Sequence, residues 1–523
     1  MIPPAALCCN SGVPVLILLF ALVRPAGAPA PRVDSRIFTG KAPGERATVL
    51  VVLREQPDLS GAAAISDRAE RRRYVYEALR AHAAATQAPL LERLRASGAA
   101  FRSHFLVNMV EVEADAPLAE ALAARADVSG VEANLEVRLP RPDPAEGPRS
   151  VLHAAATIEP NLVQVRAPEL WARGATGQGI VVGSADTGFD WEHAALRTHY
   201  RGWDGANASH AYNWHDAIHD ARTGNPCGSD AAAPCDDDGH GTETSGLLVG
   251  DDGGENRIGV APGARLIGCR NMDGGNGTPA RYTECFEWFL APTDAAGQNP
   301  RPDLGADVIN NSWGCPESEG CTSPDILKGV VENVRAAGIA VVVAAGNSGG
   351  GSGPLLPACS TISDVPSFYD AATTVGAVDL TDAIAGFSSI GPVLADGSNR
   401  LKPDLVAPGV SLRSCARGGA YADGLSGTSA AAPHVAGAVA LLWSALPELA
   451  GDLDRTEAAL ERGAVALTVD LTCGAYPGGD VPNAVFGWGR LDVEGAYLWL
   501  RPPRSEPVRS GPRPPTRRVP ERP

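Results

Sequence analysis

Four residues of this 523-residue chain have the types and the order that acyl transfer requires. Asp186 and Asn347 each follow a hydrophobic run, His240 stands between two glycines, and Ser429 precedes an apolar stretch with helical periodicity. Hydrolysis through an acyl intermediate needs a hydroxyl nucleophile, a base and a carboxylate that orients the base. It also needs a hydrogen-bond donor where the oxyanion forms. Ser429, His240 and Asp186 are therefore the candidate nucleophile, base and orienting carboxylate, and Asn347 is the candidate oxyanion donor.

Each of these residues also has an ordinary structural interpretation. A serine at a helix start is commonly an N-cap, and an Asp-Thr-Gly run is commonly a turn. Their joint occurrence at expected strand ends and helix starts favours the catalytic interpretation. An esterase of another fold would carry Gly-x-Ser-x-Gly, whereas Ala431 occupies the place of the second glycine. His434, inside the helix that follows Ser429, and His193 are interpreted as structural.

Strands and helices alternate over residues 159–498, the expected main domain. The hydrophobic pattern predicts strands at 179–185, 265–269, 307–311, 339–345 and 373–378, and helices at 280–290, 326–337 and 429–446. This alternation predicts an α/β fold, a doubly wound parallel sheet with helices on both faces. Sites in such sheets collect beyond the carboxyl ends of the strands. Asp186 and Asn347 are expected to lie there.

A smaller α+β unit is expected at residues 31–140. The pattern predicts a strand at 47–53, a helix at 62–96, one or two strands within 101–114, a helix at 118–126 and a strand at 128–137. Residues 141–158 are rich in Pro, Arg and Ala and are predicted to be an exposed linker that contains a maturation site. The Arg- and Pro-rich tail, residues 499–523, is predicted to be disordered.

The first 30 residues are typical of a signal peptide. The apolar run 13–23 is shorter than the roughly 20 residues of a membrane-spanning helix. Small residues follow that suit cleavage after Ala28 or Ala30, although no Lys or Arg precedes the run. We therefore expect a secreted or periplasmic protein without membrane attachment after cleavage.

The cysteines fit an oxidising compartment. Two of the 11 lie in the predicted signal peptide, so an odd number remains and at least one thiol stays unpaired or pairs between chains. The spacing favours disulfides Cys227/Cys235 and Cys315/Cys321, with Cys269/Cys285 as a further candidate. Metal binding is the alternative, but the chain has no Cys-x-x-Cys pair or histidine cluster.

The net charge of −17 argues against a nucleic acid as partner, because phosphate would be repelled by the acidic main body. The acidic runs 236–238 and 251–252 match no recognised ligand set and are interpreted as solvated charge runs. No cofactor is expected for the chemistry and no metal site is assigned, although a structural calcium ion is compatible with such acidic loops.

The motifs in the order Asp, His, Ser make the chain resemble the subtilisin-like serine peptidases (peptidase S8) over about residues 160–497. Within that family it is similar to the bacterial bacillopeptidase-F-like members, on the runs 268–273 and 313–316. The resemblance implies the subtilisin-like fold and the roles given above for Asp186, His240, Asn347 and Ser429. Departures at Glu243, Ala430 and Ile390 remove no proton-transfer group.

The resemblance also implies how a peptide substrate is bound. Two segments would line the site: Ser312, Trp313 and Gly314 would pair with the substrate as a strand, and Ala344, Ala345 and Gly346 would line the opposite side of the pocket. Small residues there suggest an open pocket for an apolar side chain. The N-terminal unit is similar to the ferredoxin-like propeptides that inhibit these enzymes intramolecularly and assist their folding.

The sequence thus predicts an exported serine endopeptidase that cleaves proteins or peptides and is made as a self-processing zymogen. The alternative is a catalytically silent protein that keeps the subtilisin fold as a binding module.

Overall fold

The computed structural model describes residues 33–142, 158–321, 323–351 and 356–501. The predicted signal peptide, most of the predicted linker and nearly all of the predicted tail lie outside the described residues. Within these ranges, no helix has the length and apolar content needed to cross a membrane.

The large domain is built on a seven-stranded sheet in the order β14-β13-β12-β11-β6-β8-β7, and every neighbouring pair is parallel. The strands are β6 Val181–Asp186, β7 Trp214–Asp216, β8 Arg265–Arg270, β11 Val308–Asn311, β12 Ala340–Ala344, β13 Thr373–Val378 and β14 Leu405–Pro408. The predicted parallel α/β sheet is confirmed. The pattern did not predict the two edge strands, β7 and β14, which are only three and four residues long.

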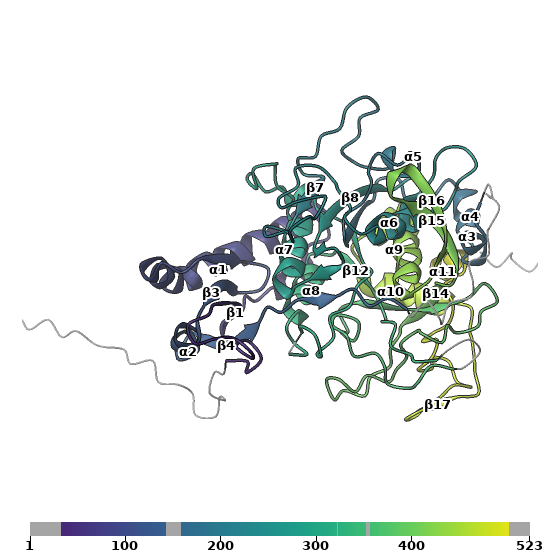
Figure 1. Cartoon of the computed structure of the whole chain (residues 1–523). Coiled ribbons are helices and arrows are strands. Elements are labelled where there is room, and N and C mark those ends of the chain that lie inside the picture. Colours follow the sequence, from purple (N-terminus) through teal and green to yellow (C-terminus); the bar gives the residue numbers. More distant parts are fainter. Residues whose placement is uncertain (1–32, 143–157, 322, 352–355, 502–523) are drawn as a thin grey trace, which may run out of the picture.

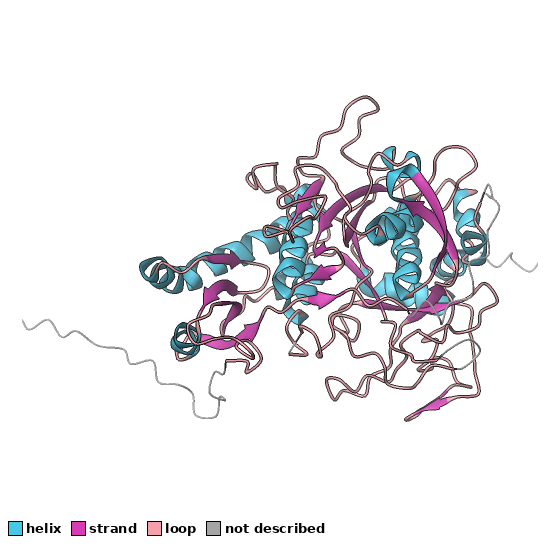
Figure 2. Cartoon of the chain, in the orientation of Figure 1, coloured by secondary structure: helices cyan, strands magenta, loops and turns pink. Residues whose placement is uncertain are grey.

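Helices cover both faces of the sheet (Figures 1 and 2). Helix α9 Thr428–Ala445 packs on strands β11 to β14 and α6 His240–Val249 packs on β6, whereas α7 Pro279–Leu290 and α8 Lys328–Ala336 contact β8 and β12. Helix α9 is apolar on all sides and is buried from Thr428 to Trp443, as expected for a helix surrounded by other elements.

Further helices and strands complete the large domain. They are α3 Pro160–Gln164, α4 Ala167–Trp171, α5 Ala194–Arg197, β9 Met272–Asp273, β10 Asn276–Gly277, β15 Leu412–Ala416, β16 Ala420–Leu425, α10 Leu453–Gly463, β17 Thr472–Cys473, β18 Tyr476–Pro477 and α11 Val493–Leu500.

Three central strands end at the same level. Asn311, the last residue of β11, is in register with Ala185 of β6 and with Val343 of β12. The segments that follow these strands therefore leave the sheet side by side at its carboxyl edge. Asp186 is the last residue of β6, and Ser312 and Asn347 lie in the segments that follow β11 and β12.

The N-terminal unit is an antiparallel sheet with the order β2-β3-β1-β4 and two helices. Its elements are β1 Ala47–Leu53, α1 Arg68–Ser97, β2 Phe101–His104, β3 Met109–Ala114, α2 Ala116–Ala123 and β4 Val128–Ala133. The order β-α-β-β-α-β is the ferredoxin-like arrangement. The predicted strand 128–137 is wrong at its end: β4 stops at Ala133, and β5 Val137–Arg138 pairs instead with β10 of the large domain.

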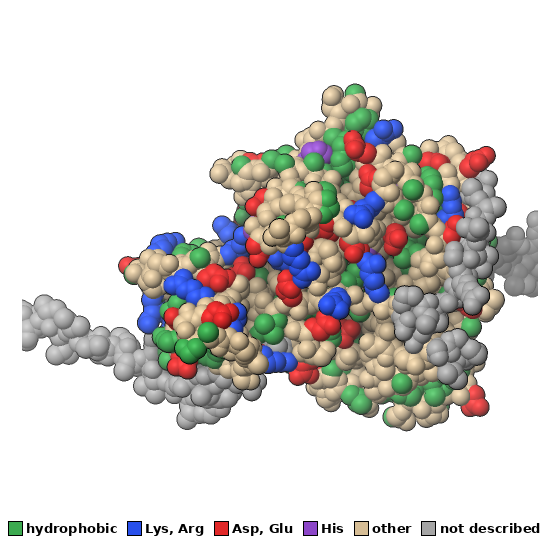
Figure 3. All heavy atoms as spheres, viewed as in Figure 1, with side chains coloured by type: hydrophobic (Ala, Val, Ile, Leu, Met, Phe, Trp, Pro, Cys, Tyr) green, Lys and Arg blue, Asp and Glu red, His purple; other side chains and the backbone are tan. Residues whose placement is uncertain are grey.

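The N-terminal unit is anchored to the large domain at two carboxylates. Glu287 of α7 accepts hydrogen bonds from the backbone N–H groups of Phe105 and Leu106, in the turn after β2. Asp307, before β11, pairs with Arg68 and Arg72 at the start of α1. Figure 3 shows side chains of both signs interspersed over the visible face of the N-terminal unit.

Four disulfides join described cysteines. Cys227–Cys235, Cys269–Cys285 and Cys315–Cys321 confirm the three predicted pairs, and Cys359–Cys473 adds a fourth that spans 114 residues. Cys415 of β15 is the free thiol among the described cysteines, and it is buried.

Candidate active site

Asp186 and His240 form a buried hydrogen-bonded pair. Asp186 ends β6 and is fully buried, and its Oδ1 accepts a hydrogen bond from Nδ1 of His240 at 2.8 Å. Thr187 N–H donates to the same oxygen at 2.8 Å, and the Thr244 hydroxyl donates to Oδ2 at 3.1 Å. These donors fix the carboxylate, and the carboxylate in turn fixes the imidazole tautomer that leaves Nε2 free to accept a proton.

The pKa of His240 lies above its ordinary value of 6.5. Burial lowers this pKa, but the charge and hydrogen bond of Asp186 outweigh burial, and the charge of Glu243 adds to the increase. If His240 is the base, it works only when neutral, and a raised pKa keeps it protonated to higher pH.

Plotted against pH, kcat/KM is therefore expected to rise along an acid limb whose midpoint lies above 6.5. Glu243→Gln should move that midpoint to lower pH, since it removes one of the charges that favour the imidazolium. Steady-state rates on one peptide between pH 5 and 10 measure this midpoint for the parent and for the variant. A midpoint that Glu243→Gln leaves in place would contradict this account.

The acidic run before His240 is structural. Asp236 is buried and accepts hydrogen bonds from Gly239 N–H at 2.8 Å and from the backbone N–H and hydroxyl of Thr242, at 2.9 and 2.5 Å. It therefore fixes the start of α6, where His240 stands. The prediction of a solvated charge run is wrong for Asp236 and for Asp237, whose side chain is also buried. It failed because these carboxylates also have partners 12 to 49 residues away in the sequence, namely Asn225, Arg270 and Thr187.

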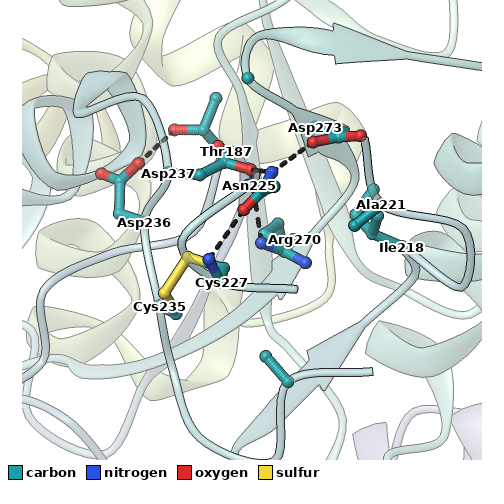
Figure 4. Close-up of polar contacts among 12 residues, drawn as sticks. Thr187, Ile218, Ala221, Asn225, Cys227, Cys235, Asp236, Asp237, Arg270 and Asp273 are labelled. Atoms are coloured by element: carbon teal, nitrogen blue, oxygen red, sulfur yellow. Dashed lines mark hydrogen bonds and ion pairs between the residues drawn. A yellow bond between two sulfur atoms is a disulfide. The ribbon is translucent and has the colours of Figure 1, made fainter. Parts of the chain in front are cut away.

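Asp237 belongs to a polar network that links this loop to the β9–β10 hairpin (Figure 4). Asn225 donates hydrogen bonds to both Asp237 and Asp273, and the guanidinium of Arg270 lies 3.3 Å from Asp237. Positive charge in this network thus comes from an arginine. Across the described ranges, no group of three or more His, Cys, Asp or Glu is arranged to hold a metal ion.

Ser429 stands in the first turn of α9 with 5% of its surface exposed. The backbone N–H groups of a first helical turn have no partner within the helix and attract negative charge. Gly427, just before the helix, has a φ of +149°, and a Cβ there would lie 2.8 Å from the Ser429 hydroxyl. Ser312 holds the segment from the other side, by donating to the Ser429 carbonyl at 2.8 Å.

Asn347 is oriented by the same helix start. Its Oδ1 accepts hydrogen bonds from the backbone N–H and hydroxyl of Thr428, at 2.9 and 3.0 Å. The amide nitrogen is thereby turned outward, and it donates to the carbonyl oxygen of Pro140 at 2.9 Å. A side-chain donor and a peptide carbonyl thus meet beside Ser429.

The structure therefore gathers the four predicted residues at one edge of the sheet. Asp186 and His240 are bonded, Asn347 is bonded to the residue before Ser429, and helices α6 and α9 pack against each other. Among the described atoms, no hydrogen bond joins the Ser429 hydroxyl to His240. Such bonds are often long outside a reacting complex.

The predicted substrate-pairing residues have other contacts. Trp313 is buried and stacks on Tyr282, with ring centroids 3.8 Å apart. Ala345 N–H bonds to Val375 of the neighbouring strand, and Gly346 N–H bonds to the Thr428 hydroxyl. Ala344 is also buried, at the end of β12. In the described part of the chain, no strand ladder joins residues 312–314 to the segment that carries Pro140.

That segment pairs with a hairpin that the sequence analysis did not identify. Residues 137 and 138 form an antiparallel ladder with β10, and Leu139 N–H donates to the Gly275 carbonyl at 2.7 Å. On the opposite side, Arg138 N–H donates to Glu319 at 2.7 Å. The Gly274-Gly275 dipeptide between two short strands was the signal for this hairpin.

Side chains of the bound segment alternate between buried and exposed. Val137 and Leu139 are buried against the large domain, whereas Arg138 is exposed. Arg141 follows Pro140 and pairs with Asp238, two residues before His240. Residues 137–141 therefore lie as an extended peptide across the candidate site, with the Pro140–Arg141 bond beside Ser429 and Asn347.

The architecture is that of an α/β protein with its polar site at the carboxyl edge of a parallel sheet. Comparison with known proteins gives the family: residues 177–489 match the model of the subtilase family, peptidase S8. The chain therefore belongs to the subtilase family.

The chain is also similar to individual named proteins. The chain is 36% identical over 402 residues to Bacillopeptidase F of Bacillus subtilis, a match that covers 75% of this chain and 26% of that protein. It is 33% identical over 296 residues to Subtilisin DY of Bacillus licheniformis, covering 56% and 88% of the two chains. The match to the Major intracellular serine protease of Bacillus subtilis is 32% over 280 residues, covering 54% and 73%. The aligned region thus spans about a quarter of Bacillopeptidase F.

Proposed function

We propose that this protein is a serine endopeptidase that cleaves peptide bonds through an acyl-enzyme intermediate. Ser429 attacks the carbonyl carbon while His240 takes its proton, and Asp186 stabilises the imidazolium that forms. Asn347 and the N–H of Ser429 bind the oxyanion. His240 then protonates the leaving amine, and water repeats the sequence to release the acyl group.

The observation that carries this proposal is the hydrogen bond from Asn347 to the Pro140 carbonyl. A peptide carbonyl is held by an amide donor beside a helix-start serine and a buried histidine–aspartate pair. Geometry of this kind serves acyl transfer, because the donor is already placed where negative charge develops. A protein that kept this fold only as a binding module would not need the Asn347 amide to face a peptide carbonyl.

The same contacts support synthesis as an inhibited zymogen. The N-terminal unit delivers residues 137–141 into the site and occupies the place of a substrate. We propose that Ser429 cuts the chain after Pro140, at the start of the linker predicted to contain the maturation site, and that the unit then remains bound as an inhibitor until it is removed.

Glu287→Gln should loosen this inhibition. The carboxylate accepts two backbone hydrogen bonds from the N-terminal unit, and such bonds to a charged group contribute about 1.5–3 kcal/mol each. Loss of the charge is expected to speed fluorophosphonate labelling of the unprocessed chain by about tenfold or more. Glu332→Gln on α8 makes the same charge change at an exposed site and should leave the labelling rate unchanged.

Export to the periplasm or medium is supported by the disulfides. Bonds of this kind persist in oxidising compartments and are rare in the bacterial cytosol. The relatives do not establish the location of this protein, since one of them is named as an intracellular protease. The test is the location of the full chain in a fractionated producing cell.

Intact mass with and without a fluorophosphonate tests the peptidase itself. The expected result is a species that begins near residue 141 and gains one adduct on Ser429. An unlabelled chain that stays unlabelled after limited proteolysis would instead favour the silent binding module. Ser426→Ala, a change at a neighbouring serine, should be labelled as the parent is.

A further inference from the structure

A buried carboxylate packs against both segments that are predicted to bind the substrate. A methyl group placed on Gly314 would lie 3.1 Å from Oδ2 of Asp364, and one placed on Gly346 would lie 3.4 Å from the same oxygen. Gly346 immediately precedes Asn347, which holds the Pro140 carbonyl. Asp364 therefore stands behind the residue whose carbonyl is presented for attack.

The position of Asp364 is fixed by its backbone. The next residue, Val365, exchanges two backbone hydrogen bonds with Cys315, at 2.8 and 3.1 Å. Cys315 directly follows Gly314, so this bridge holds Asp364 against the pocket wall. Because Gly314 and Gly346 have no side chains, the carboxylate packs directly against the backbone of both predicted substrate-binding segments.

Asp364 is only 4% exposed, and its charge has no partner of opposite sign. Its Oδ1 accepts a hydrogen bond from the Ser363 hydroxyl at 3.1 Å, and no described Lys, Arg or His pairs with either oxygen. Two other buried aspartates of the domain do have such a partner, since Asp216 pairs with Arg270 and Asp307 pairs with Arg72, and Asp236 accepts several hydrogen bonds from neutral donors where Asp364 accepts one. A buried unpaired carboxylate is costly.

Burial raises the pKa of Asp364 to about 6, and the charge of Glu319 adds to the increase. The carboxylate is consequently ionised in neutral and alkaline solution, where it can attract a cation that enters the pocket.

We infer that Asp364 selects substrates with Arg or Lys at the residue whose carbonyl is attacked. The inference rests on the proposed function and names its substrate class. A guanidinium or ammonium group would supply the missing cation in a desolvated pocket, and an uncharged side chain would leave Asp364 unpaired. The expectation of an apolar pocket came from Ala344, Ala345 and Gly346, and took no account of Asp364.

The chain's own occupant of this position is uncharged. Pro140 has no charge to pair with Asp364 and no backbone N–H to donate. The bound segment therefore lacks the charge pair that a preferred substrate would form. This suits a segment that inhibits. Pro140→Arg is expected to speed self-processing relative to Pro140→Leu, which restores the N–H group without adding charge.

Hydrolysis of a peptide series that differs only at this residue tests the inference. The processed enzyme is expected to cleave Arg and Lys peptides at least about 100-fold better, in kcat/KM, than Phe and Leu peptides. Asp364→Asn should remove most of that preference by slowing the Arg and Lys peptides, while leaving Phe cleavage within about threefold. Asp370→Asn, at an exposed carboxylate six residues further on, should behave as the parent.

The outcomes separate this inference from the proposed function. A parent enzyme that is labelled by fluorophosphonate but cleaves Phe as well as Arg would overturn the role of Asp364, and so would an equal loss on all peptides in Asp364→Asn with labelling intact. A protein that is neither labelled nor active on any peptide would overturn the peptidase itself. An advantage of Pro140→Arg over Pro140→Leu that disappears in Asp364→Asn would support the inference without added substrate.

Discussion

Ser429→Ala is expected to lower kcat by about 10⁶-fold, the order of the loss when the nucleophile of a serine peptidase is removed. Alanine lacks the hydroxyl that forms the acyl bond, and His240 then has no hydroxyl proton to take. Alanine also fits the site, because the Ser429 side chain is small and the hydrogen bond from Ser312 goes to its backbone carbonyl. The fold should therefore be retained.

The unprocessed chain is the second readout of this variant. Purified Ser429→Ala should keep the bond after Pro140 and should take up no fluorophosphonate, by intact mass. Addition of a trace of the active parent tests whether the bond can still be cut in trans. A variant that matures by itself, free of other peptidases, would show that Ser429 is not the nucleophile.

Asp186→Asn is expected to lower kcat by about 10⁴-fold with KM within about threefold. Asparagine keeps the size of the side chain, but its amide group donates where the carboxylate accepts. His240 would then turn toward the tautomer whose Nε2 carries hydrogen, and that nitrogen could no longer act as a base. The Thr244 hydroxyl would still donate to the remaining carbonyl oxygen, whereas the Thr187 N–H would lose its acceptor.

Kinetics at several pH values and thermal unfolding together check this prediction. The variant should unfold within a few degrees of the parent, because one buried polar group replaces another of the same shape. Asp190→Asn, four residues later, is the matched control and should retain activity within a fewfold. A large loss of stability would mean that the activity is lost because the fold is damaged and not because His240 cannot act as a base. A kcat close to that of the parent would show that Asp186 has no role in the mechanism.

The sheet and the ends of its central strands could be predicted from the sequence, because these features are local. Buried parallel strands are continuous apolar runs, and the polar residues that follow them stand out against that background. Asp186 and Asn347 could be identified from the sequence for this reason. The helix starts at His240 and Ser429 were marked in the same way by glycines and an apolar stretch.

Contacts between distant segments could not be predicted. Val137 and Arg138 continue the apolar alternation of β4, and only the large domain's hairpin takes them out of that sheet. Asp364 shows no periodic signal, and its role depends on its contact with Gly314 and Gly346, which lie in the segments that follow β11 and β12. The acidic run at 236–238 has the composition of a surface loop, yet the side chains of Asp236 and Asp237 are buried, and Asp236 binds Thr187, which lies 49 residues away in the sequence.

The Cys359–Cys473 bond makes a covalent ring that contains Ser429. A peptidase is exposed to other copies of itself, and exposed loops within the ring, such as that around Leu394, are open to cleavage. A single cut there would leave both pieces joined and the nucleophile attached to the rest of the domain. Molecules that migrate as intact chains on a non-reducing gel could therefore contain cleaved peptide bonds that only reduction of the disulfide reveals. Such cuts would accumulate before activity is lost.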